Sequence, residues 1–137
     1  MGPGGRRLWK GACHCRRTRF EITADIDHAR VCNCSVCRQR GALIFRVPAA
    51  DFRLLTPIGG LACYIWGSGT ARDYFCPACG ILPFRKPRAL TEAERAGGAA
   101  DFTGWAVNLR CLEGLDPDRL PKVAIGGASL RLPDQLP

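Results

Sequence analysis

The stretch Val31-Cys32-Asn33-Cys34-Ser35-Val36-Cys37-Arg38 holds three cysteines in a C-x-C-x2-C pattern. Two shorter groups flank it along the chain, Cys13-His14-Cys15 before it and Cys76-Pro77-Ala78-Cys79-Gly80 after it. Seven of the nine cysteines therefore lie in three tight groups. Close spacing of this kind is typical of metal ligands, whereas small disulfide-rich domains usually spread their cysteines so that bridges join distant loops.

The remaining composition indicates a globular protein of a reducing compartment. The cysteine count is odd, and residues 1–7 are basic but lack the apolar segment of a secretory signal. No run of 18 apolar residues is present, so we expect no membrane span. We therefore expect a cytoplasmic metal-binding protein that keeps its cysteines reduced.

A chain of 137 residues is long enough for one domain with a single core. We expect this domain to have its core at about residues 8–116. Residues 1–7 are expected to be a flexible lead-in. Residues 117–137 are rich in proline and are expected to form a C-terminal tail with little capacity to build a core.

Short apolar or alternating segments recur about every ten residues and are separated by glycine and proline, which predicts a mainly β, antiparallel domain. The expected strand segments are 8–12, 18–23, 29–32, 43–47, 52–55, 61–66, 73–75, 81–84 and 105–109. The one clear helical signal is a Thr-x-x-Glu capping box at Thr91 and Glu94, followed by Gly97-Gly98. We expect at most one or two short helices.

The two flanking cysteine groups are each half of a metal site. Residues i and i+2 of a strand point to the same side, so Cys13 and Cys15 can share one ligand face. The spacing of Cys76 and Cys79, with Gly80 after them, is that of a zinc-binding turn. Neither pair fills a site alone, and together they predict a closed four-cysteine structural zinc site.

The central group of Cys32, Cys34 and Cys37 supplies three ligands. Three protein ligands with an open fourth position are typical of a reactive zinc, so a second zinc ion with a catalytic role is expected here. The alternative is that Cys63 or Cys111 closes the site as a second structural one. Both of these cysteines also suit the role of a small buried apolar residue.

The motifs at residues 11–15, 32–38 and 75–80 resemble, in order and spacing, the family of glutathione-dependent formaldehyde-activating enzyme and centromere protein V. The resemblance covers about residues 10–115. It implies an Mss4-like fold of antiparallel sheets, a structural zinc on the four flanking cysteines and a second zinc on the central three. In the enzyme, the second zinc takes the glutathione sulfur, and the reaction is the reversible addition of glutathione to formaldehyde. One position departs from the family, which often has glycine where this chain has Arg16.

Three functions are compatible with these features. The first is a carbon–sulfur lyase, similar to S-(hydroxymethyl)glutathione synthase, that acts on an adduct of a small thiol with an aldehyde. Glutathione has two carboxylates, so arginines near the central group, Arg38 and Arg40 first, are candidates to bind them. The second is a binding module for nucleic acid or protein without catalysis. The third is a zinc-stabilised domain whose second metal is vestigial or regulatory.

The net charge does not by itself favour the binding module. The formal charge is +8, with 17 arginines and three lysines. Seven thiolates (−7) with two zinc ions (+4) would lower it to about +5. The basic residues are scattered in small groups and form no long basic tail, which supports only salt-sensitive, non-specific contacts with nucleic acid.

Overall fold

Alternating residues of strand β2 (Arg19–Ala24) build the inner face of a three-stranded sheet. Phe20, Ile22 and Ala24 are buried, and the residues between them are more exposed, as the two-residue period of a strand requires. Strand β2 pairs antiparallel with β1 (Arg7–Ala12) and with β5 (Phe52–Leu54).

The structure is a computed structural model and describes residues 5–126.

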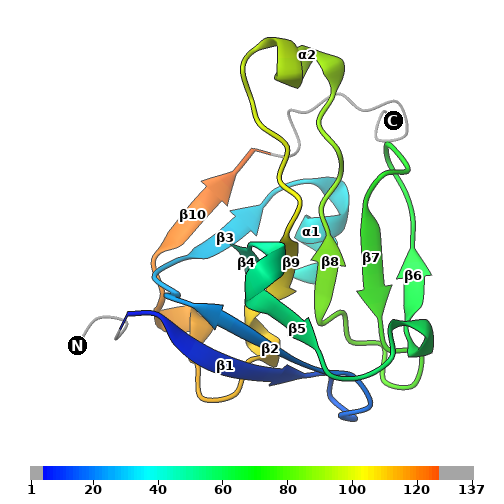
Figure 1. Cartoon of the computed structure of the whole chain (residues 1–137), viewed down its shortest axis with the longest axis vertical. Helices are drawn as coiled ribbons and strands as arrows, with labels where there is room; N and C mark the ends of the chain where they lie inside the picture. Colours follow the sequence, from blue (N-terminus) through cyan, green and yellow to red (C-terminus); the bar gives the residue numbers. More distant parts are fainter. Residues whose placement is uncertain (1–4, 127–137) are drawn as a thin grey trace.

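The second sheet has seven strands in the order β10-β3-β4-β9-β8-β7-β6 (Figure 1). Two α-helices and ten strands over residues 5–126 confirm the predicted mainly β fold with at most two short helices. The strands of this sheet are β3 (Ala29–Cys32), β4 (Ile44–Val47), β6 (Ala62–Tyr64), β7 (Arg72–Phe75), β8 (Phe84–Lys86), β9 (Trp105–Asn108) and β10 (Lys122–Ile125). Single-turn 3-10 helices occur at Ala49–Asp51, Ile58–Gly60, Leu109–Cys111 and Pro117–Arg119.

Aromatic rings from both sheets form the centre of the core. Phe20 and Phe84 are fully buried, with their ring centroids 5.5 Å apart in an edge-to-face arrangement. Phe52 stacks on Trp105 at 4.7 Å and contacts the edge of Phe84 at 5.0 Å. Each fully buried phenylalanine contributes about 1.5–3 kcal/mol through the hydrophobic effect, so this cluster fixes the two sheets against each other.

One strand pair departs from the antiparallel prediction. Strand β10 runs parallel to β3, with Lys122 opposite Ala29 and Ile125 opposite Cys32. This strand lies in the segment that we expected to be a tail from residue 117 onward. The chain turns at a buried Pro117, and the Pro121 carbonyl accepts a 2.9 Å hydrogen bond from the Ala29 amide, which brings β10 alongside β3. Residues 127–137 of the expected tail, and 1–4 of the expected lead-in, lie outside the described residues.

Helix α2 (Glu92–Ala96) confirms the predicted capping box. The Thr91 hydroxyl accepts from the Glu94 amide, and the Glu94 carboxylate accepts from the Thr91 amide. The helix lies at the outer tip of the long segment that joins β8 to β9, away from both sheets (Figure 1). None of its residues is buried, so its stability depends on local hydrogen bonds and not on packing against the core.

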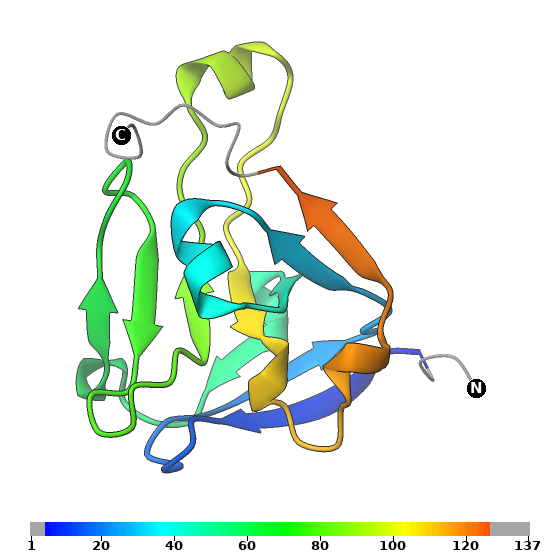
Figure 2. The same ribbon diagram turned by 180° about the vertical axis from the view of Figure 1, so that it is seen from behind.

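Helix α1 (Ser35–Arg40) follows β3 directly and lies over one face of the larger sheet (Figure 2). Its inward residue is Cys37, and the helix ends at Gly41, whose φ of 63° lies in the left-handed region that favours glycine.

None of the helices within residues 5–126 has the length and apolar character of a membrane-spanning helix.

Candidate metal centres

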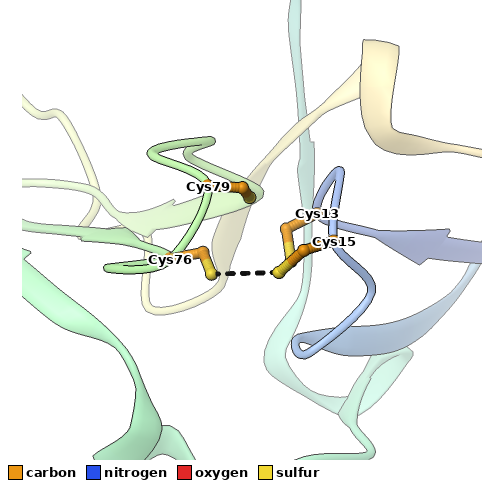
Figure 3. Close-up of side chains that lie close together, drawn as sticks. All are labelled: Cys13, Cys15, Cys76 and Cys79. Atoms are coloured by element: carbon orange, nitrogen blue, oxygen red, sulfur yellow. Dashed lines mark hydrogen bonds between the residues drawn. The ribbon is translucent and has the colours of Figure 1, made fainter.

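Four cysteines meet where two hairpins approach each other (Figure 3). Cys13 and Cys15 lie in the turn between β1 and β2, and Cys76 and Cys79 lie in the turn that follows β7. The Sγ atoms of Cys15 and Cys76 are 3.6 Å apart, those of Cys13 and Cys15 are 3.7 Å apart, and all four lie within 4.8 Å of one another. The structure thus brings together the four cysteines that spacing had paired. Cys13 and Cys15 are on a turn, however, because β1 ends at Ala12.

Backbone amides shape the two turns of this group, one by donating to sulfur and one by donating to a carbonyl. The Thr18 amide lies 3.4 Å from the Cys13 Sγ, and the Gly80 amide donates to the Cys76 carbonyl at 2.7 Å. Hydrogen bonding from the Ile81 amide lowers the pKa of the Cys79 thiol to about 6. A thiol with a lowered pKa supplies the thiolate that a metal binds, so the turn suits metal ligation.

Arg16 lies in the turn between Cys15 and β2 with a φ of 67°, the one non-glycine residue with positive φ among residues 5–126. Glycine adopts this left-handed conformation with less strain than arginine. The Arg16 guanidinium contacts the Glu113 carboxylate at 3.0 Å, but both side chains are about half exposed, so the pair contributes little.

We expect Arg16→Gly to be more stable than Arg16→Ala by about 1 kcal/mol, because alanine keeps the left-handed strain that glycine avoids. Both variants lose the contact with Glu113, so the difference between their free energies of unfolding reports the backbone strain at this position. Urea denaturation of the two zinc-loaded variants measures it. Equal midpoints would show that this turn relaxes to another conformation.

The second group joins the end of β3 to the start of α1. Cys32 is the last residue of β3, Cys34 precedes the first helical residue, and Cys37 lies in the first turn of the helix. Their Sγ atoms lie within 4.8 Å of one another, and the Cys34 amide is 3.5 Å from the Cys32 Sγ. Hydrogen bonding from the Cys37 thiol lowers the pKa of Cys34 to about 5, although burial opposes the shift. The same contact raises the pKa of Cys37.

The two remaining cysteines are not part of the three-thiol group. Cys63 is exposed on β6, at the edge of the larger sheet. Cys111 packs against the hydrophobic core, where burial raises its pKa to about 12 and the nearby Cys13 and Cys79 add to the shift. Over residues 5–126, the seven clustered thiols therefore form one group of four and one of three, a donor set that suits two zinc ions.

A cavity of about 130 Å³ opens beside the three-thiol group. All three cysteines of the group are part of its wall. The rest is lined by Trp66, Ser68, small and aliphatic residues, and four arginines. These arginines are Arg30, Arg46, Arg85 and Arg88. The Nε atom of Arg30 is buried and has no hydrogen-bond partner within the described chain.

Asp73 holds two side chains of the cavity wall in place. It is fully buried, and its Oδ1 accepts from the Arg85 Nε at 2.7 Å. Its Oδ2 accepts from Arg40 at 2.8 Å and from the Trp66 indole at 3.2 Å. Although burial opposes ionisation, the charges of Arg85 and Arg40 hold the pKa of Asp73 below its usual range. One carboxylate thus orients two side chains of the cavity, Trp66 and Arg85, and ties α1 to β7.

The two arginines predicted from sequence, Arg38 and Arg40, do not line this cavity. Arg38 is exposed on α1. Arg40 pairs with Asp73 and lines a second cavity, which Cys37 also borders. Sequence reasoning did not single out Arg30 and Arg46, which line the cavity. A signal for Arg30 was present, because Arg30 and Cys32 are two residues apart on one predicted strand and so share a face.

Arg88 is held at the cavity by Glu94 through two hydrogen bonds of 2.7 and 2.9 Å. This contact lowers the pKa of Glu94 to about 2. A carboxyl group with a lowered pKa in the folded state stabilises the protein above its ordinary pKa, and this contribution is lost as the pH falls toward the folded value.

The Glu94 carboxyl should titrate near pH 2 in an NMR experiment, and Arg88→Met should move its midpoint upward toward about 4.3, the ordinary value for glutamate. Arg95→Met, which removes another arginine of the same segment, is the control and should leave the midpoint in place. An unchanged midpoint in Arg88→Met would mean that the capping contact with Thr91 alone lowers the pKa.

Comparison with known proteins adds two findings. The family model described as glutathione-dependent formaldehyde-activating enzyme matches residues 8–99. A crystal structure of a Rhodobacter sphaeroides protein is similar to this chain, with a TM-score of 0.66 and 31% sequence identity. That alignment covers 83% of this chain and 99% of the Rhodobacter chain. The matched region includes all seven clustered cysteines.

Proposed function

This chain belongs to the family of the glutathione-dependent formaldehyde-activating enzyme, and we propose that it is a carbon–sulfur lyase or synthase for adducts of small thiols with aldehydes. The site proposed for this reaction is the group of Cys32, Cys34 and Cys37. The reaction joins a thiol sulfur to an aldehyde carbon, while the carbonyl oxygen takes up a proton. The reverse reaction breaks the same carbon–sulfur bond and returns the two reactants.

The observation that carries this proposal is the difference between the two cysteine groups. The group at Cys13, Cys15, Cys76 and Cys79 supplies four thiols, which is the full ligand set of a structural zinc ion. The group at Cys32, Cys34 and Cys37 supplies three thiols and opens onto a cavity. A site with three protein ligands and an adjoining cavity has room for a substrate as the fourth ligand.

Zinc held by the three thiolates would lower the pKa of a bound substrate thiol, so that its thiolate is available near neutral pH. The chain's own residues position that substrate. Trp66 and Ile44 provide apolar wall against which the carbon chain of a thiol can pack. The arginines provide donors for carboxylates, each worth more than a neutral donor because the hydrogen bond is charge-assisted.

Arg30 and Arg46 are our candidates for these carboxylates in place of Arg38 and Arg40. Both line the cavity, and within residues 5–126 neither forms an ion pair. Nine cysteines without a disulfide suit a reducing compartment, which supports a cytoplasmic location for the activity.

Titration of thiols into Co²⁺-substituted protein tests the proposed function. Both glutathione and 2-mercaptoethanol should perturb the sulfur-to-cobalt charge-transfer band, because each brings a sulfur to the metal. Glutathione should bind roughly tenfold more tightly, since its carboxylates add charge-assisted hydrogen bonds, and added salt should narrow the difference. The Cys34→Ser variant is the control and should lose the response. A spectrum that no thiol perturbs would contradict the proposed function.

A further inference from the structure

The charges around the cavity lead to a narrower conclusion about its ligand, which rests on the proposed function. We propose that the cavity selects thiols that carry a carboxylate and lack an ammonium group. Glutathione itself has two carboxylates and one ammonium group, so we expect this cavity to prefer a related thiol without the ammonium group.

Two of the four arginines at the cavity have uncompensated charge. Arg85 is paired with Asp73 at 2.7 Å, and Arg88 is paired with Glu94 at 2.7 Å. By contrast, the Nε of Arg30 is buried without a hydrogen-bond partner within the described chain, and Arg46 lies over the ring of Phe102 at 5.0 Å. Because Arg30 and Arg46 line the cavity and neither pairs with a carboxylate of the described chain, a ligand carboxylate would compensate their charge.

The cavity offers no carboxylate as a partner for a positive group. Among the described residues that line it there is no aspartate or glutamate. Asp73 is a buried carboxylate that contacts two residues of the cavity wall. Both of its oxygens already accept hydrogen bonds, from Arg85, Arg40 and Trp66. An ammonium group in the cavity would therefore lose water and gain no carboxylate, which is unfavourable.

The metal does not reverse this preference. Three thiolates (−3) with one zinc ion (+2) have a net charge of −1, and Arg30 with Arg46 adds +2, so the loaded site keeps +1 before a ligand enters. A further cation would be repelled by the same groups, and a carboxylate would be attracted.

The sharpest test compares glutathione with the analogue in which a glutaryl group replaces the γ-glutamyl residue, since the two differ only in one ammonium group. Both are titrated into Co²⁺-substituted protein, with 3-mercaptopropionate and cysteamine as a smaller pair. The glutaryl analogue should bind at least about fivefold more tightly than glutathione, and 3-mercaptopropionate should exceed cysteamine by more than about tenfold. Arg30→Met should reduce the second ratio severalfold, and Arg53→Met, which removes an exposed arginine of β5, should not.

The possible results separate the two proposals. Thiols that bind with equal affinity whatever their charge would overturn the charge selection and leave the proposed function intact. A cobalt spectrum that none of the four thiols changes would overturn the proposed function and the selection with it. If Arg30→Met does not fold, Arg46→Met replaces it, and the ratios measured on the wild-type protein decide the question without any variant.

Discussion

Replacement of Cys76 by serine is expected to prevent stable folding, whereas replacement of Cys34 is expected to leave a folded protein that has lost one metal. Cys76 is buried where the turn after β7 meets the turn between β1 and β2. A metal held there would close a loop of about sixty residues, and its binding free energy would be part of the folding free energy. We expect Cys76→Ser to cost about 3 kcal/mol or more, a large share of the 5–15 kcal/mol typical of a domain.

Cys34 connects only β3 to α1, which are adjacent in the sequence, so its metal constrains much less of the chain. Elemental analysis should find two zinc ions in the wild-type protein and one in Cys34→Ser, with a folded circular dichroism spectrum for both. Cys63→Ser, at an exposed position on β6, is the matched control and should keep two zinc ions and full stability. Equal loss of folding in Cys76→Ser and Cys34→Ser would contradict the division into a structural and a reactive site.

Removal of the Asp73 carboxylate is expected to have the second largest effect. Asp73 is fully buried, and the side chains of Arg40 and Arg85 keep only 26% and 16% of their surface exposed. Asp73→Ala would leave two partly buried guanidinium groups without a counter-ion. We expect a loss of about 3 kcal/mol, at the lower end of the usual range because both arginines keep some solvent contact. Asp51→Ala, which breaks a more exposed pair with Arg6, should cost no more than about 1 kcal/mol.

Urea denaturation of zinc-loaded protein measures both changes. The pKa of Asp73 is lowered in the folded state, so its contribution is complete above about pH 4, the ordinary value for aspartate, and is lost as the pH falls below it. The difference between wild type and Asp73→Ala should therefore shrink in acid. A difference that is small at neutral pH, or that grows in acid, would show that the carboxylate does not stabilise the two arginines.

The features that were predictable from the sequence are those set by neighbouring residues. The C-x-C and C-x2-C spacings place sulfurs together within one turn, and the capping box of Thr91 and Glu94 is complete within four residues. The alternation of Phe20 and Ile22 likewise follows from the strand period alone. The pairing of the two flanking cysteine pairs is long-range, but each pair is incomplete without the other.

What the sequence did not reveal depends on which strands lie side by side. Three of the four residues of β10 are exposed, so its sequence lacks the buried apolar face by which a strand is predicted. The turn at the buried Pro117 precedes it and leads the chain toward β3. The cavity arginines come from separate segments, Arg30 on β3 and Arg46 on β4, with Arg85 on β8. Their proximity is a consequence of sheet order, whereas Arg38 and Arg40 were predicted because they follow Cys37 in the sequence.

The central claim is that the metal at Cys32, Cys34 and Cys37 takes a substrate sulfur as its fourth ligand. A crystal structure of the zinc-loaded protein soaked with 3-mercaptopropionate tests it most directly. We expect the thiol sulfur at about 2.3 Å from the zinc ion held by these three cysteines, with the ligand carboxylate against Arg30. A fourth position filled by a side chain of the protein, with the thiol absent from the cavity, would contradict the claim.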